Sequence, residues 1–235
     1  MNIFVLGQGK TGALVAEVAR ERGHQVRVIG AEENRNAAAL TPAALASVDA
    51  LIDFTTPAAV VSNLPACLSA GARVVVGTTG WYEKLEEMRA LCERNDGALL
   101  YGANFSLGVQ WTYRLAEEMA RLLQGYAISM SETHHAGKKD APSGTALSLK
   151  QALLAANPAL ARQTPPLEIT SHRTGDSMGV HVVTARGTND VIELKHEALS
   201  RRGFAEGAVR AAEWLAGKRG CFDFREIYPQ LEYLP

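Results

Sequence analysis

The residues best suited to chemistry lie close together in one run, Glu132-Thr133-His134-His135-Ala136-Gly137-Lys138-Lys139-Asp140-Ala141-Pro142-Ser143-Gly144-Thr145. The run contains two histidines, two lysines and a Ser-Gly-Thr sequence preceded by proline. An imidazole can donate a proton near neutral pH, and a lysine ammonium attracts carboxylates. The composition of the run therefore indicates a site that binds an acidic small molecule and protonates it.

The elements around this run position its side chains. Residues 146–156 are predicted to form an amphipathic helix whose apolar side carries Leu147, Leu149, Leu153 and Leu154. Residues 142–145 would then lie at a helix N-terminus, where free N–H groups and the helix dipole favour anions. Residues 126–133 are predicted to form the strand that carries the two histidines and Lys138.

Two other interpretations of the run remain open. Paired histidines at a strand end are often a surface polar cluster, and Ser-Gly-Thr before a helix is often only a cap. A metal site is the second alternative. Zinc takes three or four ligands at typical spacings, and the sequence contains neither Cys-x-x-Cys nor His-Glu-x-x-His. We therefore expect no metal.

The N-terminus has the pattern of a dinucleotide-binding unit. An apolar strand at residues 2–6 is followed by Gly7-Gln8-Gly9-Lys10-Thr11-Gly12 and then by an amphipathic helix at 13–22. This is a strand, Gly-x-Gly-x-x-Gly and a helix in the order that the fingerprint requires. The glycines would form the tight turn, the approach to the pyrophosphate and the close packing of helix on strand.

The ribose-binding acid of this fingerprint is expected after a second strand at 25–29. Glu32 lies twenty residues beyond Gly12 (32 minus 12), where an acid would bind the adenosine ribose hydroxyls. Its neighbour Glu33 and the nearby Arg35 complicate the choice of cofactor. The acid favours NADH, whereas the arginine leaves NADPH open.

Further strands and helices alternate up to about residue 105. Strands are predicted at 48–54, 73–76 and 98–101, with helices between them. This βαβ alternation predicts a Rossmann-like, doubly wound parallel sheet, whose ligands lie over the carboxyl ends of the strands. The segments expected to line that crevice are Phe54-Thr55-Thr56, Gly77-Thr78-Thr79 and Gly102-Ala103-Asn104-Phe105.

The pattern changes after residue 106. A long helix is predicted at 107–124, with Trp111, Leu115, Met119 and Leu122 towards the core. Strands at 167–172, 180–185 and 191–196 without intervening helices predict an inserted α+β domain. We expect a dinucleotide-binding domain at 1–105, completed by 202–235, and a substrate-binding domain at 106–201. The substrate is then expected between the two domains.

Bulk properties indicate a soluble enzyme. The formal net charge is −1, so neither nucleic acid nor a membrane surface is an expected partner. Asp49 and Asp53 interrupt the apolar stretch at 43–61, and no membrane span is predicted. The early first strand leaves no room for a signal peptide. Cys67, Cys92 and Cys221 share no motif, which is typical of reduced thiols in the cytoplasm.

Over almost its whole length, the sequence resembles the 4-hydroxy-tetrahydrodipicolinate reductases, also called dihydrodipicolinate reductases, of lysine and diaminopimelate biosynthesis. The matching segments are 7–12, Gly77-Thr78-Thr79-Gly80-Trp81, Ala103-Asn104-Phe105-Ser106, 132–146, Arg173-x-Gly175, Gly179-x-His181, and 196–215 with Ser200-Arg201, Phe204 and Gly207-Ala208-Val209-Arg210. The His-His-x-x-Lys-x-Asp-Ala-Pro-Ser-Gly-Thr part of the run at 132–145 is highly specific.

The resemblance implies the role of individual residues. His134 matches the proton donor, and Lys138 matches the lysine that assists it and holds the substrate. His135, Ser143, Gly144, Thr145 and Arg201 match positions at or near the bound dicarboxylate. The cofactor contacts implied are Gly7, Gln8, Gly9, Lys10, Thr11, Gly12, Glu32, Gly77, Thr78, Thr79, Gly102, Ala103, Asn104 and Phe105. The resemblance also implies reduction with NADH or NADPH, and a homotetramer assembled through the β-rich domain.

The chain departs from the family pattern in three places. It is shorter than many members, Ala136-Gly137 replaces a bulkier and often basic pair, and Gly102-Ala103 replaces the more usual Ala-Ala. These differences bear on the preference for a 2′-phosphate and on substrate affinity, and they do not affect the catalytic residues. Two rival functions also stay open. One is another NAD(P)-dependent dehydrogenase of a small acid or sugar, and the other is a non-enzymatic nucleotide-sensing module. Histidines 172 and 181 are interpreted as structural.

Overall fold

The computed structural model describes residues 1–231 and divides the chain into two compact units. Unit 1 comprises Met1–Ser106 together with the segment from Arg202 onward, and unit 2 comprises Leu107–Arg201. The last four residues of the expected segment 202–235 lie outside the described residues.

Unit 1 is built on a six-stranded sheet with the strand order β10-β5-β4-β3-β1-β2, in which all pairs are parallel. Its elements are β1 Asn2–Leu6, α1 Lys10–Glu21, β2 Gln25–Ile29, α2 Pro42–Leu45, β3 Ala50–Asp53, α3 Pro57–Ser69, β4 Arg73–Val76, α4 Leu85–Arg94, β5 Ala98–Tyr101, α7 Arg202–Leu215, β10 Gly220–Asp223 and α8 Phe224–Ile227. The expected Rossmann-like sheet is confirmed.

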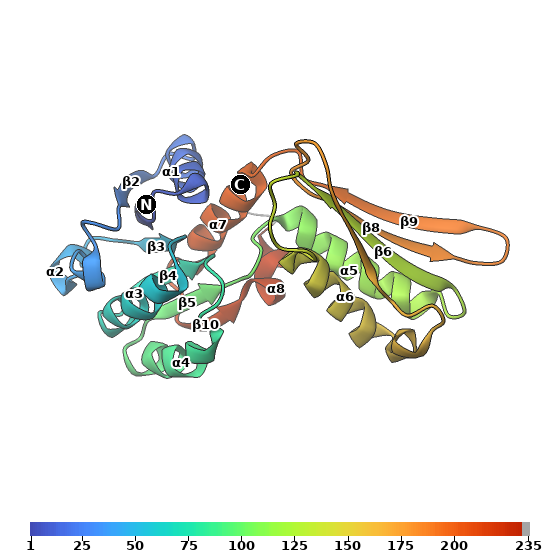
Figure 1. The fold of residues 1–235 in the computed structure, drawn as a ribbon. Helices are drawn as coiled ribbons and strands as arrows, with labels where there is room; N and C mark the ends of the chain where they lie inside the picture. The colour runs from blue at the N-terminus through green and yellow to red at the C-terminus, as the bar shows by residue number, and fades with distance from the viewer. Residues whose placement is uncertain (232–235) are drawn as a thin grey trace. The chain divides into compact units, whose positions relative to one another are not determined.

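The central strands of this sheet are buried on both faces. Helices α1 and α7 pack together, as do α3 and α4, and the two pairs lie on opposite sides of the sheet (Figure 1). Strands β3, β4 and β5 are short runs of almost uninterrupted apolar residues, as two-sided burial in a parallel sheet requires. Because all strands point the same way, the loops that follow β1, β3 and β4 meet at one edge.

Unit 2 has a four-stranded mixed sheet in the order β7-β6-β8-β9, covered on one face by two helices (Figure 1). Strands β6 and β7 are parallel, whereas β8 is antiparallel to both β6 and β9. The elements are α5 Leu107–Leu122, β6 Ala127–His134, α6 Gly144–Ala156, β7 Ile169–Arg173, β8 Val180–Arg186 and β9 Val191–Glu197. This is the expected second domain with a mixed sheet.

The predicted core faces of the two helices in unit 2 are partly wrong. Leu115 and Leu122 of α5 are 52% and 76% exposed, and Leu147 of α6 is 47% exposed. The buried face of α5 instead includes the small residues Ala116 and Ala120. Small side chains allow a neighbouring helix to approach closely, so the contact with α6, not the size of the leucines, determines which face is buried.

Among the described residues, no helix is both long enough and apolar enough to cross a membrane.

Candidate active site

The loop between β1 and α1 has the backbone geometry that its glycines require. Gly7 has φ +106, and a Cβ there would lie 2.4 Å from the Phe54 carbonyl oxygen. A Cβ on Gly12 would lie 2.2 Å from the carbonyl oxygen of Gly7. Gly9 is the N-cap of α1 and has no side-chain cap, and a Cβ there would meet nothing within 4 Å. The loop thus presents open space at a helix N-terminus, as a pyrophosphate site needs.

A cavity of about 540 Å³ lies beside this loop. Its lining includes Gly7, Gln8 and Gly9, and a neighbouring, more open hollow is lined by Gly9, Lys10, Thr11, Gly77, Thr78 and Thr79. The structure therefore brings three of the predicted segments together in unit 1. Gly12 is buried beneath the loop in α1, where it serves packing.

Glu32 does not line this cavity, whereas Arg35 does. The end of β2 presents Gly30 and Ala31 to the cavity instead of an acid, and Glu32 is exposed. Glu33 pairs with Arg27 of β2. The described lining contains no carboxylate, so its one charged group is the Arg35 guanidinium.

Asp53, at the end of β3, anchors the wall of the cavity. Its carboxylate accepts hydrogen bonds from Thr55 N (2.9 Å) and Asn63 Nδ2 (2.8 Å), and Asn63 in turn accepts from Asn34 (2.9 Å). Burial raises the pKa of Asp53 and these hydrogen bonds oppose the rise. The sequence located Asp53 at a strand end but did not reveal that it ties β3 to two segments of the cavity wall.

The segment Gly102 to Phe105 follows β5 and lies outside the lining of both hollows. Phe105 is 1% exposed and packs on Phe224, with ring centroids 4.4 Å apart. Asn104 is buried, and its side-chain oxygen accepts the N–H of Ser106. In this structure the segment makes packing contacts, and its contact with a cofactor stays a prediction.

In unit 2, the strand β6 carries Glu132 and His134 into the interior. Alternate residues of a strand point to the same face, and Ile128, Met130, Glu132 and His134 are the buried positions of β6. The first two pack in the core beneath α5 and α6. The two polar residues continue that face beyond the apolar core, at the carboxyl end of the strand.

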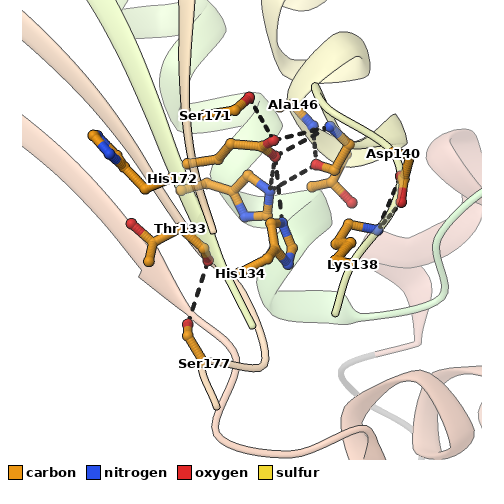
Figure 2. A network of polar contacts seen from close by, with 12 residues as sticks. Thr133, His134, Lys138, Asp140, Ala146, Ser171, His172 and Ser177 are labelled. Carbon is orange, nitrogen blue, oxygen red and sulfur yellow. Dashed lines mark hydrogen bonds and ion pairs between the residues drawn. The ribbon is translucent and has the colours of Figure 1, made fainter. Parts of the chain in front are cut away.

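The Glu132 carboxylate is the centre of a polar network (Figure 2). It accepts hydrogen bonds from Ser143 N (3.1 Å), Ser171 Oγ (2.8 Å) and Arg173 Nη2 (2.8 Å). The Nε2 atom of His134 lies 3.3 Å from Glu132 Oε2, and that of His181 lies 3.6 Å away. His181 Nε2 is also 3.2 Å from Ser143 Oγ.

The ionisation states follow from burial and these contacts. Burial raises the pKa of Glu132, but hydrogen bonds from Ser143, Arg173 and Ser171 outweigh it and lower the pKa to about 2. Burial lowers the pKa of His134; the Glu132 charge opposes this, whereas Lys138 and Arg173 add to it. Burial also lowers the pKa of His181, to about 4. At neutral pH the cluster therefore contains an ionised carboxylate and a neutral His181.

The N-terminus of α6 lies beside this cluster. Ser143 caps the helix by accepting the N–H of Ala146 at 3.2 Å and is itself buried. Gly144, the first residue of α6, is exposed, and a Cβ there would meet nothing within 4 Å. Lys138 Nζ donates to both oxygens of Asp140, at 2.7 and 2.9 Å (Figure 2). An ammonium and an accessible helix N-terminus thus occur together in the same run.

The other residues of the site are placed as follows. His135 is half-buried, and its N–H donates to Ser177 O at 2.8 Å, which holds the end of β6 to the loop before β8. Arg201 is the last residue of unit 2 and is not among the residues that contact Glu132. His172 is exposed on β7 and points away from the cluster (Figure 2).

The sequence predicted no catalytic or binding role for four members of the cluster, namely Glu132, Ser171, Arg173 and His181, and His181 was interpreted as structural. Glu132 stands first in the run that drew attention to His134, and the period of a strand places both on one face. Arg173 and His181 come from β7 and β8, 41 and 49 residues beyond Glu132 (173 minus 132, 181 minus 132). No local pattern connects these segments.

Glu132, His134 and His181 offer possible metal-ligand atoms within 4.8 Å of one another. The carboxylate, however, already accepts hydrogen bonds from Ser143, Ser171 and the Arg173 guanidinium. A fixed positive charge on the carboxylate opposes the binding of a cation.

Comparisons with known proteins cover the whole described site. Residues 1–105 match the family model for the dihydrodipicolinate reductase N-terminus, and residues 108–227 match the model for its C-terminus. A 4-hydroxy-tetrahydrodipicolinate reductase of Christiangramia forsetii is 35% identical over 98% of this chain and 99% of its own length. One from Natronomonas pharaonis is 37% identical over 96% of this chain and 99% of its own.

Solved structures have the same fold. A dipicolinate-bound dihydrodipicolinate reductase from Paenisporosarcina sp. TG-14 superposes with a TM-score of 0.80 and 21% identity, covering 97% of this chain and 99% of that one. An amine dehydrogenase from Mycobacterium smegmatis superposes with a TM-score of 0.66 and 11% identity, covering 100% and 98%.

Proposed function

The chain belongs to the dihydrodipicolinate reductase family, and from this we propose how its residues carry out the NAD(P)H-dependent reduction of 4-hydroxy-tetrahydrodipicolinate to tetrahydrodipicolinate, a step of lysine and diaminopimelate biosynthesis. Unit 1 binds the nicotinamide cofactor, and unit 2 binds the dicarboxylate and supplies the proton. One observation supports this division of roles. His134 and the N-terminus of α6 both contact the Glu132 carboxylate, and that helix end is open at Gly144.

The cofactor is a nicotinamide dinucleotide, which when bound supplies the hydride. The uncapped N-terminus of α1 at Gly9 receives the pyrophosphate, since its N–H groups and dipole favour an anion. Thr78 and Thr79 border the adjoining hollow. The cavity beside Gly30 and Arg35 receives the adenosine end.

We propose that NADPH is accepted along with NADH because Arg35 lines this cavity and Glu32 does not. Replacing Arg35 by Ala should raise KM for NADPH by roughly 10-fold, the value of a charged hydrogen bond, and leave KM for NADH within about 2-fold. Arg94, exposed at the end of α4, provides the matched control R94A. Equal changes of both KM values in R35A would contradict the assignment.

The dicarboxylate is held by residues of the run at 132–145. Its carboxylates are bound by the N-terminus of α6 at Gly144 and Thr145 and by Lys138 and His135, with Arg201 nearby. Ser143 supports this site without binding the substrate itself, because its N–H donates to Glu132 and its hydroxyl accepts the N–H of Ala146. Lys138 exchanges Asp140 for the substrate when the ligand binds.

His134 donates the proton that the reaction consumes. The 4-hydroxyl group leaves as water, which gives the conjugated unsaturated ring that accepts the hydride. Hydride addition to that ring leaves negative charge on the conjugated neighbours, and a positioned acid neutralises it. The approach of a dianionic substrate favours the imidazolium form, which offsets the effect of burial on the pKa of His134. The Nε2 atom of His134 is buried and lies 3.3 Å from Glu132 Oε2, so the carboxylate is in contact with the imidazole that donates the proton.

The experiment for this function follows the absorbance of NADH and NADPH with 4-hydroxy-tetrahydrodipicolinate generated in situ from pyruvate and aspartate semialdehyde by the synthase that forms it. Turnover that depends on the synthase supports the proposal. Tight dinucleotide binding with turnover only on another small acid or sugar would favour a different dehydrogenase. Dinucleotide binding that a dicarboxylate does not affect, with no turnover, would favour a nucleotide-sensing module.

We further propose a homotetramer in the cytoplasm, assembled through the sheet of unit 2. The core residues of this sheet face α5 and α6, so Ser129, Val182 and Thr184 present its other face without being buried. Small and β-branched side chains suit face-to-face packing of sheets. In sedimentation velocity we expect one species of four chain masses; a single species at the chain mass of 25.2 kDa would refute the assembly.

A further inference from the structure

We propose that Glu132 is a positioning residue for this reaction, which holds the His134 imidazole and the N-terminus of α6 in register and keeps a negative charge beside the proton donor. The inference rests on the proposed function of His134. Its geometric basis is one buried carboxylate in contact with residues of three strands and a helix cap.

The Glu132 carboxylate links the proton donor to the helix end mechanically. Glu132 accepts from Ser143 N at 3.1 Å, and Ser143 is the N-cap of α6. The same carboxylate lies 3.3 Å from His134 Nε2. The proton donor and the carboxylate-binding helix end are therefore both in contact with the Glu132 carboxylate. A shift of this side chain changes the distance between them, and sub-ångström placement governs proton transfer.

The bonds from β7 keep that carboxylate from moving. Ser171 Oγ and Arg173 Nη2 each donate to Oε1 at 2.8 Å. The Arg173 guanidinium also donates to the backbone oxygen of Asp140, so it ties the loop of Lys138 to the same strand. The carboxylate side chain has no solvent exposure, and a buried charge with several charged hydrogen bonds is strongly held in place.

Glu132 also acts on His134 through its negative charge. The titratable groups around His134 are Lys138 from the following loop, Arg173 from β7, and His181 from β8 with His196 of β9 behind it. Lys138 and Arg173 are cations. His181 and His196 are neutral imidazoles, because burial lowers the pKa of each. Glu132 is the only carboxylate within ion-pair distance of His134 among residues 1–231. Its charge is what favours an imidazolium in this site.

Two variants separate position from charge. E132Q keeps the size of the side chain and removes the charge, so the pKa of His134 should fall. Since His134 acts as the acid, the high-pH decline of kcat/KM should begin at a lower pH in E132Q, and kcat at neutral pH should fall ~10- to 100-fold. E132D keeps the charge but shortens the reach, so its pH profile should match wild type while KM for the dicarboxylate rises.

The matched control is E168Q, which changes an exposed glutamate of unit 2 just before β7 in the same way. It should behave as wild type. The pKa of His134 is read independently of activity from the imidazole Cε1–H resonance, assigned by its loss in H134Q. Circular dichroism and thermal unfolding report that unit 2 of each variant is folded.

The outcomes distinguish this inference from the proposed function. A lower His134 pKa in E132Q, together with a shifted pH profile that E132D restores, supports the positioning role. A His134 pKa and pH profile in E132Q equal to those of wild type, in an active wild-type enzyme, overturns it. If wild type itself fails to turn over the dicarboxylate, the proposed function fails, while the resonance of His134 still tests the electrostatic contact.

Discussion

In H134A, kcat is expected to fall by about 10² to 10⁴-fold, the usual contribution of a positioned general acid. Alanine removes the only proton donor that we assign to the reaction and leaves the hydride donor untouched. Dinucleotide affinity should stay within about 2-fold, because the cavity and glycine loop belong to unit 1. Stopped-flow absorbance for turnover and cofactor fluorescence for binding measure the two effects on the same sample.

The chain offers a matched control in H172A. His172 lies one strand away on β7, is exposed, and points away from the Glu132 network (Figure 2). We expect its turnover to equal that of wild type. If H134A retained a kcat within about 3-fold of wild type, the proton donor would have to be sought elsewhere in unit 2, with His135 and Lys138 as the next groups to replace.

The second large effect is expected from two glycines that serve different purposes. In G12A the new Cβ lies 2.2 Å from the backbone oxygen of Gly7, so the loop and α1 must move apart. Overpacking against backbone costs about 1–3 kcal/mol or more, and both the unfolding free energy and the dinucleotide affinity should fall. Urea unfolding and cofactor titration measure the two quantities.

G9A is the informative partner of this variant. Gly9 has φ −71 and open space where a Cβ would point, so the free protein should accept alanine with little change in stability. The methyl group would occupy the space that the pyrophosphate requires, and affinity should drop ~10- to 100-fold. G9A and G12A with equal losses of stability, or a G9A variant that binds cofactor as wild type does, would contradict this account of the loop.

Much of unit 1 could be predicted from the sequence. The structure has β1, β4 and β5 at the predicted residues, because strands buried on both faces appear as short apolar runs bounded by turn residues. The Gly-x-Gly-x-x-Gly loop could also be predicted from the sequence. Its requirements, a positive φ at Gly7 and a close approach at Gly12, are local and are met by residue type alone.

The cavity beside the glycine loop, which we propose for the cofactor, shows how far a count of residues can place a side chain. Counting from the glycines predicts Glu32 as the ribose ligand, and in this structure Arg35 lines the cavity whereas Glu32 does not. The chain between β2 and α2 contains a short 3₁₀ turn at Arg35–Ala37 with positive φ at Asn36. The direction of each side chain in such a segment depends on how the backbone bends over the sheet, and a count of residues does not contain that information.

The site in unit 2 was also predicted only in part from the sequence. Residue types and spacing within one segment identified His134, Lys138 and the helix end at Ser143, because all lie in fourteen consecutive residues, 132–145. Only the tertiary structure brought Ser171, Arg173 and His181 to Glu132. Strand pairing sets these contacts, and pairing depends on which distant segments bury each other's apolar faces. The sequence alone therefore identified the groups that we propose to react, and the packed sheet decided how they are held and charged.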